Sequence, residues 1–298
     1  MAAEVPTENA QLNRSGWGGL GRSWFWLASA AALLAAAGSV VGLSASSAVY
    51  GQETELLADQ AAAQDVVNLL LVAPLTILLG WFATRGAARA YVVWLGCLAF
   101  TVYNYAIYAF SIHFGPLFLV WVAVLGLTLF ALIGGLATAD TAAITASSAG
   151  RVARWPAWFL ITVAVLFALL WLREIVPDLV AGAPSTSAKD WQVPTNPVHV
   201  LDLAFFLPAA AAGGVLLLRR HKMGYVTTAG SLTWVTLTSL PILVTPLVAD
   251  ARGHQPIWAV AGPIGVILLT SVAALFWLLR HPRSAASPEP PVQLEAGD

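Results

Sequence analysis

Charged residues are scarce in this chain. Only 10% of its 298 residues are Asp, Glu, Lys or Arg, whereas 59% are hydrophobic; an ordinary soluble domain is about 25% charged. So little charge cannot cover a water-facing surface, which excludes a soluble globular protein. The 14 Lys and Arg residues are scattered between apolar runs. They form no basic stripe that could neutralise a phosphate backbone, so we expect no nucleic-acid partner.

Cysteine and metal-binding motifs are lacking as well. Cys97 is the single cysteine, so the chain can form no intramolecular disulfide and no CxxC pattern. No HxxxH or HExxH spacing is present, and we predict no metal site beyond a weak, scattered ligand set such as His113, His199, Asp202 and His254. The sequence has no P-loop and no G-x-G-x-x-G at a strand-to-helix junction, and we expect no cofactor.

Apolar runs of membrane-spanning length are what the chain has in abundance. A helix needs about 20 apolar residues to cross roughly 30 Å of hydrocarbon. Eight runs approach or exceed this length, at about residues 24–43, 66–84, 90–110, 116–137, 157–171, 198–218, 225–248 and 257–279. The sequence therefore predicts an all-α fold, a polytopic bundle of eight transmembrane helices whose first partner is the lipid bilayer.

The Lys and Arg residues outside these runs predict the orientation. They precede the first run, follow the eighth, and occupy the linkers after the second, fourth and sixth runs; the other linkers carry mainly acid or little charge. Only Arg173, Lys189 and Arg252 depart from this alternation. Because cytoplasmic loops are enriched in Lys and Arg, we predict a cell-membrane protein with both termini in the cytoplasm.

The first run has an alternative interpretation as a cleaved signal peptide. Ser46-Ser47-Ala48 is an acceptable small-residue cleavage site. The leader before the run is long and the run itself has the length of a full span, which favours a retained helix.

A single fixed shift aligns the chain with itself. It pairs Pro74 with Pro208, Gly80 with Gly214, Arg85 with Arg219 and Tyr91 with Tyr225, and it places Trp24-Phe25 on Trp158-Phe159. These residue types match by chance less readily than Leu, Val or Ala. We therefore predict a parallel duplication of four helices, whose symmetry axis runs along the membrane normal with the second and sixth helices near it.

This duplication divides the chain into four parts. Residues 1–22 are expected to form a disordered cytoplasmic leader, 23–150 and 151–283 the two four-helix repeats, and 284–298 a disordered cytoplasmic tail.

Polar residues inside or at the ends of spans are functional candidates, because burying them in hydrocarbon is costly. With the orientation above they gather in the extracytoplasmic half. The candidate ligand-binding residues are Asp65, Asn68, Tyr103, Asn104, Tyr108, His113, His199 and Asp202. No catalytic residue is assigned.

Several of these candidates also have a structural explanation. Asp65 is repeat-equivalent to His199 and Asn68 to Asp202, so a two-fold bundle can bring the four around one polar cavity, as a base, a proton relay or a weak metal site. Alternatively, Asp65 and His199 cap their helices at the water interface. The tyrosines likewise fit an aromatic belt at the membrane surface.

The stretches Gln64-Asp65-Val66 with Pro74, Tyr103-Asn104-Tyr105-Ala106, and Val200-Leu201-Asp202-Leu203 with Pro208 resemble a family of bacterial multi-pass membrane proteins without an assigned activity. The resemblance covers about two thirds of the chain. It implies a membrane location and a bacterial source, and it supplies no catalytic residue.

Three functions are compatible with the sequence. The repeat and its paired prolines favour a transporter or permease for a small solute. The one-sided polarity favours a membrane-embedded enzyme or a lipid-binding protein with an outward-facing site and a small-molecule or lipid ligand. Small-residue faces such as Gly134-Gly135 and Gly213-Gly214 favour an accessory subunit that packs against a partner membrane subunit or a second copy of the chain.

Overall fold

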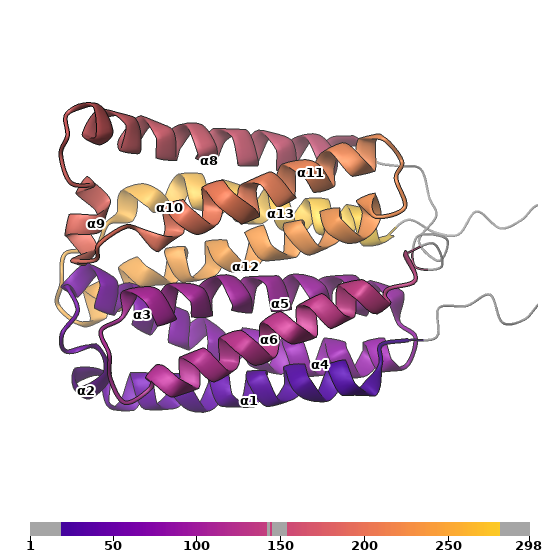
Figure 1. The fold of residues 1–298 in the computed structure, drawn as a ribbon, viewed down its shortest axis with the longest axis horizontal. Coiled ribbons are helices and arrows are strands. Elements are labelled where there is room, and N and C mark those ends of the chain that lie inside the picture. The colour runs from indigo at the N-terminus through magenta and orange to yellow at the C-terminus, as the bar shows by residue number, and fades with distance from the viewer. Residues whose placement is uncertain (1–18, 142–143, 145–153, 281–298) are drawn as a thin grey trace, which may run out of the picture.

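The computed structural model describes residues 19–141, residue 144 and residues 154–280. Over these residues the chain is helical and contains no strand (Figure 1). Most of the predicted leader and all of the predicted tail lie outside the described residues, as do the basic residues Arg14, Arg151 and Arg283.

The helices form two successive sets, which we call the first half and the second half. The first set is α1 (Arg22–Ser44), α2 (Ser46–Tyr50), α3 (Glu55–Val67), the π-helix η3 (Asn68–Val72), α4 (Ala73–Thr84), α5 (Ala88–Ser111) and α6 (Phe118–Thr138). The second set is α8 (Arg154–Val180), α9 (Thr186–Trp191), α10 (Pro197–Leu201), the π-helix η4 (Asp202–Phe206), α11 (Leu207–Leu218), α12 (Gly224–Ala251), the 3₁₀-helix η5 (Trp258–Val260) and α13 (Ala261–Arg280).

Eight helical segments of the described chain are long and apolar enough to cross a membrane. Segments α3–η3–α4 and α10–η4–α11 each count as one continuous span, as does η5–α13. The prediction of an all-helical chain with eight candidate spans is therefore confirmed. In Figure 1, α2 and α9 lie together at one end of the bundle, and α1 begins and α13 ends at the opposite end. We call the first of these the α9 end.

The fifth span is longer than predicted. Its apolar run ends at Trp171, whereas α8 continues to Val180 through Arg173 and Glu174, with Pro177 in its last turns. The apolar run marks the part of a helix that hydrocarbon favours, and backbone hydrogen bonding carries this helix further. Glu174 therefore lies within α8 and not at its end.

The two π-helices have the same cause. Pro74 and Pro208 each follow shortly after a π-helix and carry no N–H to donate to the preceding turn. A proline ring also clashes with the carbonyl four residues earlier, and widening the helix to i→i+5 bonds relieves that clash. Asn68 and Asp202 begin the two π-helices, and the sequence shift that pairs the prolines also pairs these two residues.

The centre of the bundle is the crossing of α5 and α12. Gly96 on α5 lies so close to α12 that a Cβ atom there would meet Thr233 Cβ at 2.4 Å and the Gly230 carbonyl oxygen at 2.7 Å. Gly230 faces back toward Gly96 and is its counterpart under the same sequence shift. The sequence placed the second and sixth spans at the centre, but α5 and α12 occupy it, because two glycines allow their backbones to approach.

The two halves differ in how their outer helices pack. In the first half α1 packs along α6, with Gly134 of α6 seated against the Trp24 ring. In the second half α8 and α13 make few contacts. They meet near the end opposite α9, where the Trp155 and Trp277 rings lie 6.4 Å apart. Both helices expose most of their surface, as expected for lipid-facing helices.

The crossing predicts a position-specific effect of alanine. Gly96→Ala inserts a methyl group into the α5–α12 contact, and overpacking of this kind costs about 1–3 kcal/mol. We expect a lower thermal unfolding midpoint in detergent, measured by fluorescence-detected size exclusion. Gly126→Ala, where a Cβ meets nothing within 4 Å, is the matched control and should unfold at or above the wild-type temperature. Equal midpoints for both variants would contradict the close crossing.

Candidate functional site

The described residues line a cavity of about 730 Å³ between the two halves and within the second half. This volume is typical of pockets that hold a small organic ligand. Its walls come from α3 and α5 of the first half and from α8, α10, α12 and α13 of the second. Five of the predicted site residues line it, namely Tyr103, Asn104, Tyr108, His199 and Asp202.

One wall of the cavity is formed by the halves of α5 and α12 nearest the α9 end. Asn104 and Ile107 line it from α5, and Thr238 and Pro241 line it from α12. The sequence shift that pairs the two central glycines also pairs Asn104 with Thr238 and Ile107 with Pro241. The Asn104 amide nitrogen donates to the Phe100 carbonyl oxygen at 3.0 Å, within its own helix. The cavity therefore lies against the central crossing of the bundle.

A polar cluster stands on the other wall, where α8 faces α10 and η4. The Trp171 indole nitrogen donates to Asp202 Oδ2 at 2.8 Å, and the Trp171 ring lies 4.6 Å from the His199 ring. His199 Nε2 lies 3.9 Å from Glu174 Oε2. We call Trp171, Glu174, His199 and Asp202 the Trp171 cluster. Its four members come from two spans that are adjacent in the sequence.

Several polar atoms at the cavity have no partner among the described residues. They are Asp202 Oδ1, Glu174 Oε1, Thr238 Oγ1 and Trp234 Nε1. Asp202 is only 5% exposed. Leaving a buried polar atom unpaired is costly, and more so for a charged group, so such atoms are normally paired in the working protein. All four residues line the cavity, although the unpaired atoms themselves expose less than 1 Å² each.

The end of the second half opposite α9 is closed by packed apolar residues. Leu160 on α8, Leu232 on α12 and Ala274 on α13 are fully buried there and belong to one continuous core. None of these three residues lines the cavity, whose lining residues lie toward the α9 end.

Asp65 does not line the cavity, and lies in the first half instead. It accepts hydrogen bonds from Tyr50 at 2.6 Å, Ser39 at 2.9 Å and Tyr108 at 3.3 Å. A Cβ atom at Gly42 would lie 2.2 Å from Asp65 Oδ2, so this glycine makes room for the carboxylate. Burial, reinforced by the nearby carboxylate, raises the pKa of the Tyr50 phenol well above its usual value, which keeps it a donor. All three donors to Asp65 are hydroxyl groups of the first half.

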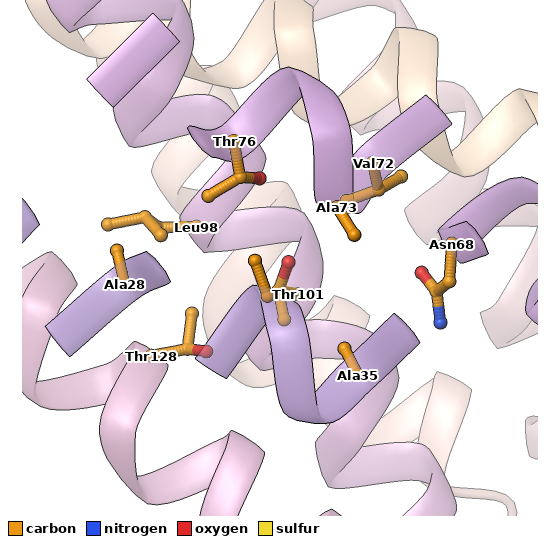
Figure 2. A pocket seen from close by; sticks show the side chains of 10 residues that line it. Ala28, Ala35, Asn68, Val72, Ala73, Thr76, Leu98, Thr101 and Thr128 are labelled. Atoms are coloured by element: carbon orange, nitrogen blue, oxygen red, sulfur yellow. The ribbon is translucent and has the colours of Figure 1, made fainter. Parts of the chain in front are cut away.

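Asn68 also lies apart from the cavity, in the interior of the first half. It borders a void of only about 10 Å³ together with Thr76, Thr101 and Thr128 (Figure 2). Asn68 Oδ1 accepts from Gln64, while Asn68 Nδ2, Thr76 Oγ1 and Thr128 Oγ1 have no partner among the described residues. A void of this size holds about one water molecule, which these atoms can bind. The four predicted residues Asp65, Asn68, His199 and Asp202 therefore do not share one cavity.

His113 lies outside the cavity as well. Its Nδ1 atom is 3.0 Å from Glu53 Oε2, and its backbone N–H donates to Glu53 Oε1 at 2.9 Å. The pair ties the loop after α5 to the loop before α3.

Sequence reasoning missed a second buried carboxylate at the α9 end. Asp59 on α3 pairs with Arg252 Nη1 at 3.2 Å and His254 Nδ1 at 2.8 Å, both just beyond α12. Arg252 also donates to the Ser46 hydroxyl at 3.1 Å. These contacts join the two halves across the mouth of the cavity. The sequence did contain one indication of this contact, because Arg252 is one of the few basic residues on the predicted outer side.

Trp171 and Glu174 of the cluster were missed for a different reason. They end an apolar run and look like interfacial residues, yet their spacing of three places both on one face of α8.

Comparison with known proteins gives no match, whether to a protein family, a curated protein or a solved structure.

The Asp59 contacts predict a stability effect. Arg252→Gln removes the guanidinium group that pairs with Asp59, whose side chain is only 4% exposed. Losing a charge-assisted partner of a buried group costs about 1–3 kcal/mol. We expect a lower unfolding midpoint, partly restored by adding Asp59→Asn. Arg173→Gln, at an exposed position of α8, serves as the control. A double variant no more stable than Arg252→Gln alone would show that the pair is energetically neutral.

Proposed function

We propose that the protein binds an amphipathic, lipid-like molecule in the 730 Å³ cavity, with its polar group at the Trp171 cluster and its chain among the apolar walls. The observation that carries this proposal is the division of the cavity wall. Val163, Ile264 and Ile267 line its apolar part, and the Trp171 cluster supplies polar atoms that lack partners among the described residues. In the predicted topology the α9 end is extracytoplasmic, so the site serves the outer leaflet.

The loose packing of α8 against α13 supports entry from the side. Residues lining the cavity recur on one face of α8 and on one face of α13, while the two helices make few contacts with each other. Their other faces are exposed and apolar, as with Leu169 and Leu269. A lipid chain can pass between such helices without crossing water.

A parallel four-plus-four duplication is part of the proposal. It is supported by features that recur under one sequence shift: the two π-helices, the two prolines and the glycine pair Gly96 and Gly230 at the centre. Ligand sites tend to lie where such repeats meet, and the cavity borders that surface.

The experiment uses a neutral probe, a long-chain alcohol carrying a photoactivatable diazirine in its chain. In nanodiscs we expect it to label cavity-lining residues such as Phe167, Ile242 and Ile264, read at residue level by mass spectrometry, besides lipid-facing residues of the same helices. Thr238→Phe places a ring inside the cavity and should abolish labelling of the cavity-lining residues by steric exclusion, while labelling of the lipid-facing residues persists.

The matched control is Leu247→Phe on the same helix, at a 56% exposed position outside the cavity, which should label like wild type. Labelling of Thr238→Phe at the wild-type level would refute binding in this cavity.

A small-solute transporter is the second candidate. The observation that favours it is the pair of π-helices at equivalent positions of the second and sixth spans, because irregular helix segments at membrane depth often mark transport sites. Transport further requires an opening through the Leu160 and Leu232 core. Proteoliposomes that take up a solute, and lose this uptake with Asp202→Asn, would support transport over binding alone.

A further inference from the structure

We propose that the ligand of this cavity is an amphipathic amine, whose ammonium group is held by the carboxylates of Asp202 and Glu174. This inference rests on the proposed function and deepens it by specifying the charge of the polar group.

The ionisable residues that line the cavity are mostly acids. They are Glu55, Asp59, Glu174 and Asp202, together with His199 and His254, and none of the described lining residues is Lys or Arg. The guanidinium of Arg252, which pairs with the lining residue Asp59, also bonds the Ala58 carbonyl oxygen and Ser46. An anionic headgroup would therefore meet carboxylates without a cation to offset them, whereas a cation gains from both.

Two of the other lining acids, Asp202 and Glu174, each carry an oxygen atom without a hydrogen-bond partner among the described residues. Asp202 accepts the Trp171 N–H with Oδ2 and also interacts with the Tyr103 hydroxyl, while no donor among the described residues lies within hydrogen-bonding distance of its Oδ1. Glu174 faces His199 with Oε2, and its Oε1 is likewise without a partner there. An ammonium group carries up to three N–H donors and no acceptor, so it suits a cavity wall that carries two carboxylates.

Aromatic rings complete the environment. Trp171, Tyr103 and Trp234 line the cavity, and the Tyr103 and Trp234 rings pack edge to face at 5.6 Å. Ring faces attract cations within about 6 Å of their centroids, most strongly in a desolvated site. A wall of carboxylates and aromatic rings is the combination that binds amines in preference to alcohols or acids.

The test is competition against the neutral diazirine probe in phosphatidylcholine nanodiscs, with dodecylamine, dodecanol and dodecanoate as chain-matched competitors. We expect dodecylamine to displace the probe at a concentration roughly 10- to 100-fold lower than dodecanol, the effect of charge-assisted hydrogen bonds. Dodecanoate should compete least. In the double variant Asp202→Asn, Glu174→Gln, the amine and the alcohol should compete equally, while the probe still labels.

Asp178→Asn is the matched control, because Asp178 lies one turn beyond Glu174 on α8, is partly exposed and is absent from the cavity wall. It should keep the preference for the amine. Competition by the amine no better than by the alcohol, or a preference that survives the double variant, would overturn the inference and leave the proposed function standing. Absence of cavity labelling in the wild type would instead remove the proposed function itself.

Discussion

The close approach of α5 and α12 at Gly96 and Gly230 is the contact on which the rest of the structure depends. Two glycines facing each other let the helix backbones meet at the centre of the bundle, in a bilayer where packing and not hydrophobic exclusion holds helices together. From that point α5 and α12 carry Asn104 and Thr238 toward the α9 end, where both line the cavity. The crossing thus sets the depth and the position of the site.

The two halves differ in what surrounds their equivalent interior positions. Asn68 borders a void that holds about one water, enclosed by α1 and α6, which pack along each other. Asp202, at the equivalent position of the proposed duplication, borders the large cavity because α8 and α13 converge at Trp155 and Trp277 and make few contacts beyond. One half is a closed four-helix core. The other half is open around a cavity. Its carboxylate, Asp202, occupies the position at which the closed half has the amide of Asn68.

The sequence was sufficient for the number and type of the spans, because apolar runs and basic linkers are local signals. It also identified Asp202, His199 and Asn104 as unusual, since polar residues within a span are costly. It could not tell Asp65 from Asp202. Both are carboxylates near the start of a span, and only tertiary packing shows that hydroxyl groups satisfy the first while Asp202 Oδ1 has no partner among the described residues. Likewise, Trp171 contacts the next span along the chain and Asp59 contacts residues just beyond α12, and a residue pattern specifies neither contact.

If the second half is an open, ligand-holding bundle, its ligand should remain in place when the protein is extracted gently. The most direct measurement is a cryo-electron microscopy map of the protein extracted into nanodiscs with its native lipids. We predict an elongated density between α8, α12 and α13, with its polar end at Asp202 and Glu174. A map in which α8 packs along α13 as α1 packs along α6, with side chains filling the space, would contradict the proposed site.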